Sequence, residues 1–311
     1  MRLPRPPVFW RPPHSNALSS GPSCSREGAR GFPALQTRMA TESKPLAMTP
    51  SLLYEVTVRT PIAPLHAEPR IASQMISQQL AGHRLSVLDE EGDWACVRGA
   101  DDYEGWMHTG FLARSPAAGG SARQSRTTSR ISLGCTTRAS GGGTAGGGRA
   151  LPLRAILAPD ETPTAGEAID SDERRRRFPA TADTVVASAQ RFFEGTSYLW
   201  GGVTPWGADC SGLVQSVFAL HGLQLPRDAW QQAERGEDAG RDIGELHAAD
   251  LLFFTDREDG RVTHVGIALG GARMVHLALG RGGYAIERLS DRSDPYVEKL
   301  RQRFLFAKRV I

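Results

Sequence analysis

The sequence predicts a multidomain chain in which small all-β barrels come before one larger α+β domain. Residues 50–115 contain short strands of alternating hydrophobicity that are separated by turns. Residues 213–220 have the apolar spacing of a helix. Two further alternating strands flank the Gly-Gly pair at 270–271. A chain of 311 residues is long enough for two or three domains of this kind.

The first 48 residues are rich in Pro, Ser and Arg, and they contain no apolar run of signal-peptide length. No stretch approaches the roughly 18–20 apolar residues that span a bilayer. We expect a disordered tail, or an upstream extension of a chain that starts near Met39 or Met48, with a basic transit-like leader as the alternative. A cytoplasmic protein with no membrane partner follows from this interpretation.

The first barrel is predicted at residues 50–115. Its expected strands are short and alternating, and they cover residues 55–59, 84–88, 94–97 and 104–108. A turn at Glu91-Gly92-Asp93 separates the second strand from the third. Residues 116–126 have the composition of a linker. Residues 127–178 look like a second, degenerate barrel in which glycine and proline dominate. The basic run 174–177 at its end is expected to be a solvated linker.

Charge and cysteine content narrow the possible partners. The chain has 37 basic and 34 acidic residues, for a net charge of +3, which does not favour nucleic acid or a membrane surface. Its four cysteines are too few and too scattered for a disulfide framework, so a reducing compartment is expected. We expect no cofactor and no metal.

Cys210 is the most informative residue of the predicted α+β domain, which covers residues 180–311. It directly precedes the predicted helix, and Asp209 can cap the N-terminus of that helix. Unpaired N–H groups and the helix dipole at this end favour a thiolate. Cys210 is therefore predicted to be a nucleophile, against the alternative of a small buried packing residue.

Two histidines on the following strands can serve that nucleophile. His264 is predicted on the same strand face as Gly266 and Ala268, whose small size would let the Cys210 helix approach. A three-residue loop at 269–271 would place His264 opposite His276. We predict His264 as the base and His276 as the residue that orients it. A zinc site built from the three residues is an alternative, although no CxxC or HxxxH pair supports it.

These residues resemble one known family. Six motifs match in order and spacing over residues 180–311, and they are similar to the NlpC-type bacterial cell-wall cysteine peptidases: Gly195-Thr-Ser-Tyr-Leu-Trp-Gly-Gly202, Asp209-Cys-Ser-Gly212, Pro226-Arg-Asp228, Ala249-Asp-Leu-Leu-Phe-Phe254, Thr263-His-Val-Gly-Ile267 and Met274-Val-His276. The resemblance implies a papain-like α+β fold and cleavage of the bond between γ-D-glutamate and a diamino acid in murein peptides. Residues 82–106 resemble a bacterial SH3-like domain.

The subgroup with two SH3-like domains implies further contacts. In it, the first SH3-like domain closes one end of the cleft and binds the free amino group of L-Ala, and the matching positions are Glu68 and Tyr103. The cleft would then accept murein tripeptides or tetrapeptides with a free N-terminus. Three tryptophans either line the cleft or belong to the core: Trp200, Trp206 and Trp230.

The remaining substrate contacts implied by the resemblance lie within the catalytic domain. They match Asp209 and Ser211 beside the nucleophile, and Asp228 further along. Tyr198 matches the tyrosine whose hydroxyl lines the thiolate pocket. The chain departs from the subgroup at Ala229, where a serine is common, so one hydroxyl contact to the substrate is missing.

The sequence thus predicts a γ-D-glutamyl-L-diamino acid endopeptidase of cell-wall peptide recycling. Two alternatives stay open. One is a different acyl transfer on the same core, by an amidase or acyltransferase, and the other is an inactive wall-binding protein.

Overall fold

The computed structural model describes residues 52–114, 129–139 and 148–311. The expected tail at 1–48 and the expected linker at 116–126 lie outside these ranges. Within the described ranges, every helix is too short or too polar to cross a membrane.

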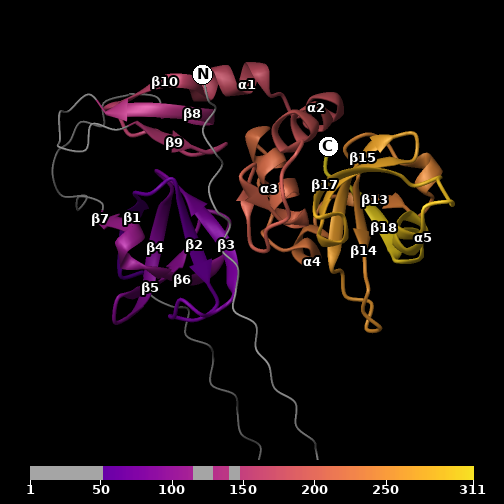
Figure 1. The fold of residues 1–311 in the computed structure, drawn as a ribbon, viewed down its shortest axis with the longest axis horizontal. Helices are drawn as coiled ribbons and strands as arrows, with labels where there is room; N and C mark the ends of the chain where they lie inside the picture. Colours follow the sequence, from indigo (N-terminus) through magenta and orange to yellow (C-terminus); the bar gives the residue numbers. More distant parts are fainter. Residues whose placement is uncertain (1–51, 115–128, 140–147) are drawn as a thin grey trace, which may run out of the picture. The chain divides into compact units, whose positions relative to one another are not determined.

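The first domain is a seven-stranded antiparallel sheet in the order β3-β2-β6-β5-β4-β1-β7 (Figure 1). It consists of β1 (Tyr54–Val58), β2 (Ile62–His66), β3 (Met75–Leu80), β4 (Arg84–Glu91), β5 (Trp94–Arg98), β6 (Glu104–His108), the 3-10 helix η1 (Thr109–Phe111) and β7 (Leu112–Arg114). Alternate residues such as Val56, Val87 and Val97 are buried in one core. The predicted turn between β4 and β5 is confirmed, and Gly92 adopts the positive φ of +58° there.

The stretch predicted as a second barrel contains a three-stranded antiparallel sheet in the order β10-β8-β9. Its strands are β8 (Ile131–Ala139), β9 (Arg149–Leu151) and β10 (Glu161–Ile169). β9 ends at Leu151 because the next residue, Pro152, has no N–H with which to continue the ladder.

The basic run 174–177 is mostly exposed, as the sequence predicted, but it is helical and not a linker. It forms the last part of helix α1 (Ser171–Arg177), and the carboxylate of Asp170 caps the N-terminus of this helix. Arginine is a good helix former, and Arg174 donates to the carbonyl of Leu220 at 3.1 Å, so α1 is attached to the α+β domain.

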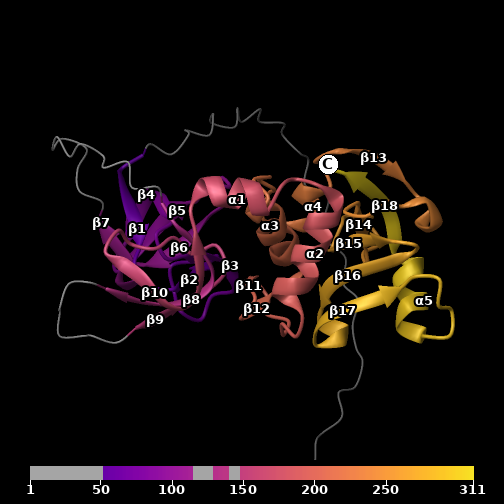
Figure 2. The same cartoon turned by 90° about the horizontal axis from the view of Figure 1, so that it is seen from above.

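The α+β domain combines a six-stranded antiparallel sheet, in the order β13-β18-β14-β15-β16-β17, with helices on both faces (Figure 2). Its helices are α2 (Ala182–Phe193), α3 (Cys210–Leu220), α4 (Ala229–Gln232) and α5 (Pro295–Gln302). Its strands and 3-10 helices are β11 (Val203–Thr204), β12 (Gly207–Ala208), β13 (Glu237–Gly240), η2 (Ile243–Glu245), β14 (Leu251–Phe254), β15 (His264–Gly270), β16 (Arg273–Ala278), η3 (Leu279–Arg281), β17 (Gly283–Arg288) and β18 (Phe304–Arg309).

The sheet presents a different face to α3 than the sequence predicted. Val265, Ile267 and Val275 pack in the core cluster that also contains the apolar residues of α2 and α3. Gly266 and Ala268 were expected to make room for α3, but they lie on the opposite face, where Ala268 packs with Met274. The branched apolar side chains bury more surface against the helix than Gly and Ala would, which favours this orientation.

The turn between β15 and β16 also differs from the expected three-residue loop. Ile267 pairs with Val275, a bulge follows before Gly270, and a two-residue turn closes the hairpin. Gly271 and Ala272 have φ of +59° and +56°, and a type I′ turn requires positive φ at both central residues. The shift from the predicted register is two residues, so both histidines keep the same face but lie diagonally rather than opposite each other.

Candidate active site

The predicted nucleophile opens helix α3. Asp209 caps the helix, as the sequence predicted, because its Oδ1 accepts the backbone N–H of Gly212 at 2.8 Å. The side chain of Cys210 is almost completely buried, and the backbone N–H groups of Val265 and Ser211 lie at its sulfur. Since Val265 directly follows His264, the thiol rests against the start of β15, where the predicted base is located.

The thiol is not ionised in advance, contrary to the prediction made from its place at the helix N-terminus. Burial raises the pKa of Cys210 to about 12, and the carboxylate of Asp209 acts in the same direction. The two backbone N–H groups and Arg227 lower this pKa but do not outweigh burial. The sulfur is therefore a thiol until a base removes its proton.

The two predicted histidines are in direct contact. His264 Nε2 and His276 Nδ1 are 2.8 Å apart, and the two rings are tilted by 71° to each other. Burial, together with His276 and Arg303, holds the pKa of His264 well below 6.5. His264 is consequently a neutral imidazole at neutral pH, and its Nδ1 is the nitrogen left to accept a proton from a thiol.

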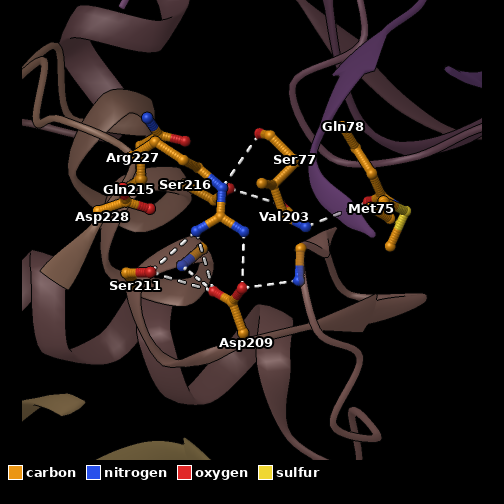
Figure 3. A network of polar contacts seen from close by, with 12 residues as sticks. Met75, Ser77, Gln78, Val203, Asp209, Ser211, Gln215, Ser216, Arg227 and Asp228 are labelled. Atoms are coloured by element: carbon orange, nitrogen blue, oxygen red, sulfur yellow. Dashed lines mark hydrogen bonds and ion pairs between the residues drawn. The ribbon is translucent and has the colours of Figure 1, made fainter. Parts of the chain in front are cut away.

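Arg227 is a functional candidate that the sequence analysis missed. Its side chain is 1% exposed, and its guanidinium donates to both carboxylate oxygens of Asp209, at 3.0 and 2.7 Å (Figure 3). The same guanidinium donates to the hydroxyl of Ser211 at 2.8 Å and to Ser77 of the first domain at 3.1 Å. It thus holds the residues on both sides of the nucleophile. The sequence did offer a signal for this residue, because Arg227 lies within the Pro226-Arg-Asp228 motif.

Asp209 and Ser211 were predicted to contact substrate, but their side chains are already engaged within the protein. The carboxylate of Asp209 accepts from Arg227, Ser211 and the backbone N–H groups of Gly201 and Gly212. The hydroxyl of Ser211 donates to Asp209 and accepts from Arg227. These side chains therefore hold the start of α3 in place around the nucleophile, and neither has a polar atom without a partner inside the protein.

The predicted contact residues Tyr103 and Asp228 are brought together from two domains. The hydroxyl of Tyr103 lies 3.1 and 3.3 Å from the two carboxylate oxygens of Asp228, which also accepts from the indole N–H of Trp230 at 3.3 Å. Glu68 is placed differently. Its side chain is 55% exposed and forms an ion pair with Arg70 at 2.5 Å.

Tyr198 is near enough to Cys210 for their charges to interact, and its predicted place in the thiolate pocket stays a prediction. Burial raises its pKa, and the charges that Cys210 and Asp209 can carry add to this effect, so its hydroxyl remains a donor. Ala229 is buried at the start of α4. Trp200 and Trp206 are 57% and 54% exposed, which excludes them from the core.

The zinc alternative finds no support in the geometry. Among the residues that the structure describes, no group of three or more His, Cys, Asp or Glu side chains is arranged to hold a metal ion. Cys210, His264 and His276 do not form such a group.

Comparisons with known families match two parts of the chain. Residues 195–300 match the model of the NlpC/P60 family, and residues 63–113 match that of the bacterial SH3 domain. The first match contains all three predicted catalytic residues, and the second contains Glu68 and Tyr103. The predicted second barrel at 127–178 lies outside both of these matches and stays a prediction.

Two curated relatives carry the same name. A gamma-D-glutamyl-L-lysine dipeptidyl-peptidase of Bacillus subtilis is 38% identical over 136 residues, which are 40% of this chain and 45% of the relative. One of Bacillus cereus is 24% identical over 262 residues, or 73% of this chain and 74% of the relative. The chain thus spans less than half of the first relative and about three quarters of the second.

A solved structure supports the fold. The crystal structure of an NlpC/P60 family protein from Bacillus cereus superposes with a TM-score of 0.66 at 19% identity, covering 82% of this chain and 99% of that one. The predicted fold class, strand-rich SH3-like structure followed by an α+β catalytic domain, is confirmed.

Proposed function

We propose that the chain, in which residues 195–300 match the NlpC/P60 family and residues 63–113 match a bacterial SH3 domain, is a γ-D-glutamyl-L-diamino acid endopeptidase. Its substrates are murein tripeptides or tetrapeptides with a free N-terminal L-Ala. The names of the two Bacillus relatives support the bond that is cleaved. The observation that carries the proposal is the pairing of His264 with His276 next to the strand residue that contacts the Cys210 thiol.

The proposed reaction is acyl transfer through the sulfur of Cys210. His264 takes the thiol proton as the sulfur attacks the γ-carbonyl of D-Glu, because neither group is charged beforehand. The backbone N–H of Cys210 and the hydroxyl of Tyr198 stabilise the oxyanion. The imidazolium of His264 then protonates the leaving amine of the diamino acid. Water activated by His264 finally hydrolyses the thioester.

The requirement for a free N-terminus is proposed from the contact between Tyr103 and Asp228. This carboxylate receives donors from Tyr103 and Trp230 and can accept further hydrogen bonds from an α-ammonium group. An acylated amine would leave the carboxylate without a cationic partner, so such a substrate is disfavoured. Glu68 is the second proposed partner of the ammonium group, and it would have to leave Arg70 to reach it.

A site of this kind acts on peptides already released from muramic acid. We therefore propose that the protein acts in the cytoplasm, on short murein peptides that the cell has imported for recycling. Intact wall, in which the L-Ala amine is acylated, is not a substrate under this proposal.

The test compares hydrolysis of L-Ala-γ-D-Glu-diaminopimelate with hydrolysis of its N-acetylated form. We expect cleavage of the free peptide only, and none by the Cys210→Ala variant. If neither peptide is cleaved, the result would favour the alternative of an inactive wall-binding protein. Equal cleavage of both would rule out the N-terminal pocket while keeping the peptidase.

A further inference from the structure

A buried carboxylate lies at the far end of the histidine pair. Glu287 on β17 is 4% exposed, and its Oε1 is 3.4 Å from Nε2 of His276. The register of β16 and β17 pairs His276 with Ala285, so Glu287 lies two residues further along on the same sheet face. His264, His276 and Glu287 thus lie diagonally across three neighbouring strands. Figure 2 shows these strands, β15, β16 and β17, side by side.

The carboxylate is held in its ionised form. Arg281 donates to Glu287 Oε1 at 2.8 Å and to Oε2 at 3.0 Å, and the same guanidinium also binds Asp294. Burial by itself raises the pKa of Glu287, but the hydrogen bonds from His276 and Arg281 outweigh it, and the pKa is lowered. The ring of Tyr296 lies under the guanidinium at 4.2 Å and holds it in place.

An ionised carboxylate can only accept hydrogen bonds. When both imidazoles are neutral, this fixes the direction of each hydrogen bond in the row Glu287–His276–His264. His276 must carry its proton on Nε2 in order to donate to Glu287. Its Nδ1 is then an acceptor, so His264 must carry its own proton on Nε2. That arrangement leaves Nδ1 of His264 free of a proton, which is the state that a base needs. The opposite tautomer of His276 would donate from Nδ1 and force a proton onto Nδ1 of His264.

A role limited to pairing with Arg281 does not account for the position of Glu287. Arg281 already has a second carboxylate partner in Asp294, whose side chain is 32% exposed and costs little to keep in water. Glu287 is instead almost completely buried against His276, where a carboxylate loses its contact with water and depends on the hydrogen bonds of Arg281 and His276.

We propose that Glu287 is a positioning residue that sets the tautomers of His276 and, through it, of His264, and so extends the row Cys210–His264–His276 by one member. The inference rests on the proposed function in that His264 acts as the base. Glu287 makes no contact with substrate in this role. Nothing in the NlpC/P60 family match or in the names of the relatives assigns it.

The first experiment measures the tautomers directly in the full-length protein without substrate. Long-range ¹H–¹⁵N spectra of the imidazole rings report which ring nitrogen carries the proton. We expect His276 and His264 both to be protonated on Nε2 in the wild-type protein. Detection of Nδ1–H on His276 in the wild type would overturn the inference, and this measurement needs no variant that could fail to fold.

The second experiment compares two variants of the same ion-pair cluster. In Glu287→Gln the amide can present its N–H₂ to His276, so we expect His276 to shift towards the Nδ1–H tautomer. We expect kcat to fall about 10²-fold with KM little changed, since loss of a general base costs at least about that much. The control Asp294→Asn removes a carboxylate from Arg281 but not from His276, and asparagine can still cap α5.

The outcomes separate this inference from the proposed function. Unchanged tautomers in Glu287→Gln, or an equal loss of kcat in Asp294→Asn, would overturn the role of Glu287. A wild-type protein with the expected tautomers that cleaves no murein peptide would support the role of Glu287 and would contradict the proposed substrate alone.

Discussion

At the scale of single residues, the thiol of Cys210 and the ring of His264 are both uncharged at neutral pH, because burial disfavours the charged form of each. Activity requires the neutral imidazole, so on the acidic side kcat/KM is lost when the pH falls through the lowered pKa of His264. We expect the acidic limb of the kcat/KM profile to have its midpoint below pH 6.5.

The same pair predicts how the thiol reacts with a small alkylating agent. Because the pKa of Cys210 is raised to about 12, the rate of iodoacetamide alkylation should keep rising with pH through the alkaline range. Measuring both profiles on one preparation checks the two groups together. A plateau of alkylation beginning near neutral pH would show a preformed thiolate and would contradict the neutral pair.

At the scale of secondary-structure elements, what the sequence could predict depended on how local the signal was. The start of α3 and its cap at Asp209 follow from neighbouring residues, and both were predicted correctly. The register of β15 and β16 depends on whether Ala272 adopts a positive φ, which its residue type does not indicate. For the same reason Glu287 was not recognised, since its strand face depends on the length of the turn before β17.

The start of α3 also depends on one buried ion pair, whose loss we can predict. Arg227→Met leaves the buried carboxylate of Asp209 without its cation, which should lower the free energy of unfolding by about 3–5 kcal/mol. Denaturant unfolding measures this change. The control Arg257→Met breaks an exposed ion pair with Asp259 and should leave stability unchanged. Similar midpoints for both variants would contradict a structural role for Arg227.

At the scale of the whole molecule, the first domain and the catalytic domain share polar contacts that no local pattern predicts. Gln78 accepts the backbone N–H of Val203 at 3.1 Å, and Asp101 accepts from Gln215 at 2.9 Å. The residues of each pair are more than a hundred positions apart in sequence. The sequence pattern of each domain predicted its structural class. The contact between the domains could not be predicted, because Gln78, Asp101 and Gln215 are polar residues of types found on any protein surface. Only the resemblance to a known family pointed to Tyr103.

The contact between Tyr103 and Asp228 gives the prediction that depends on both domains. Tyr103→Phe keeps the ring but removes the hydroxyl that donates to the carboxylate of Asp228. A hydrogen bond to a charged group is worth about 1.5–3 kcal/mol, so kcat/KM for a peptide with a free N-terminus should fall roughly tenfold or more. The N-acetylated peptide does not use this carboxylate and should remain uncleaved. Tyr54→Phe, which removes a phenol bonded to Glu90 in the same domain, is the matched control and should change neither rate. If Tyr103→Phe retains the wild-type preference for the free peptide, the first domain takes no part in recognising the N-terminus.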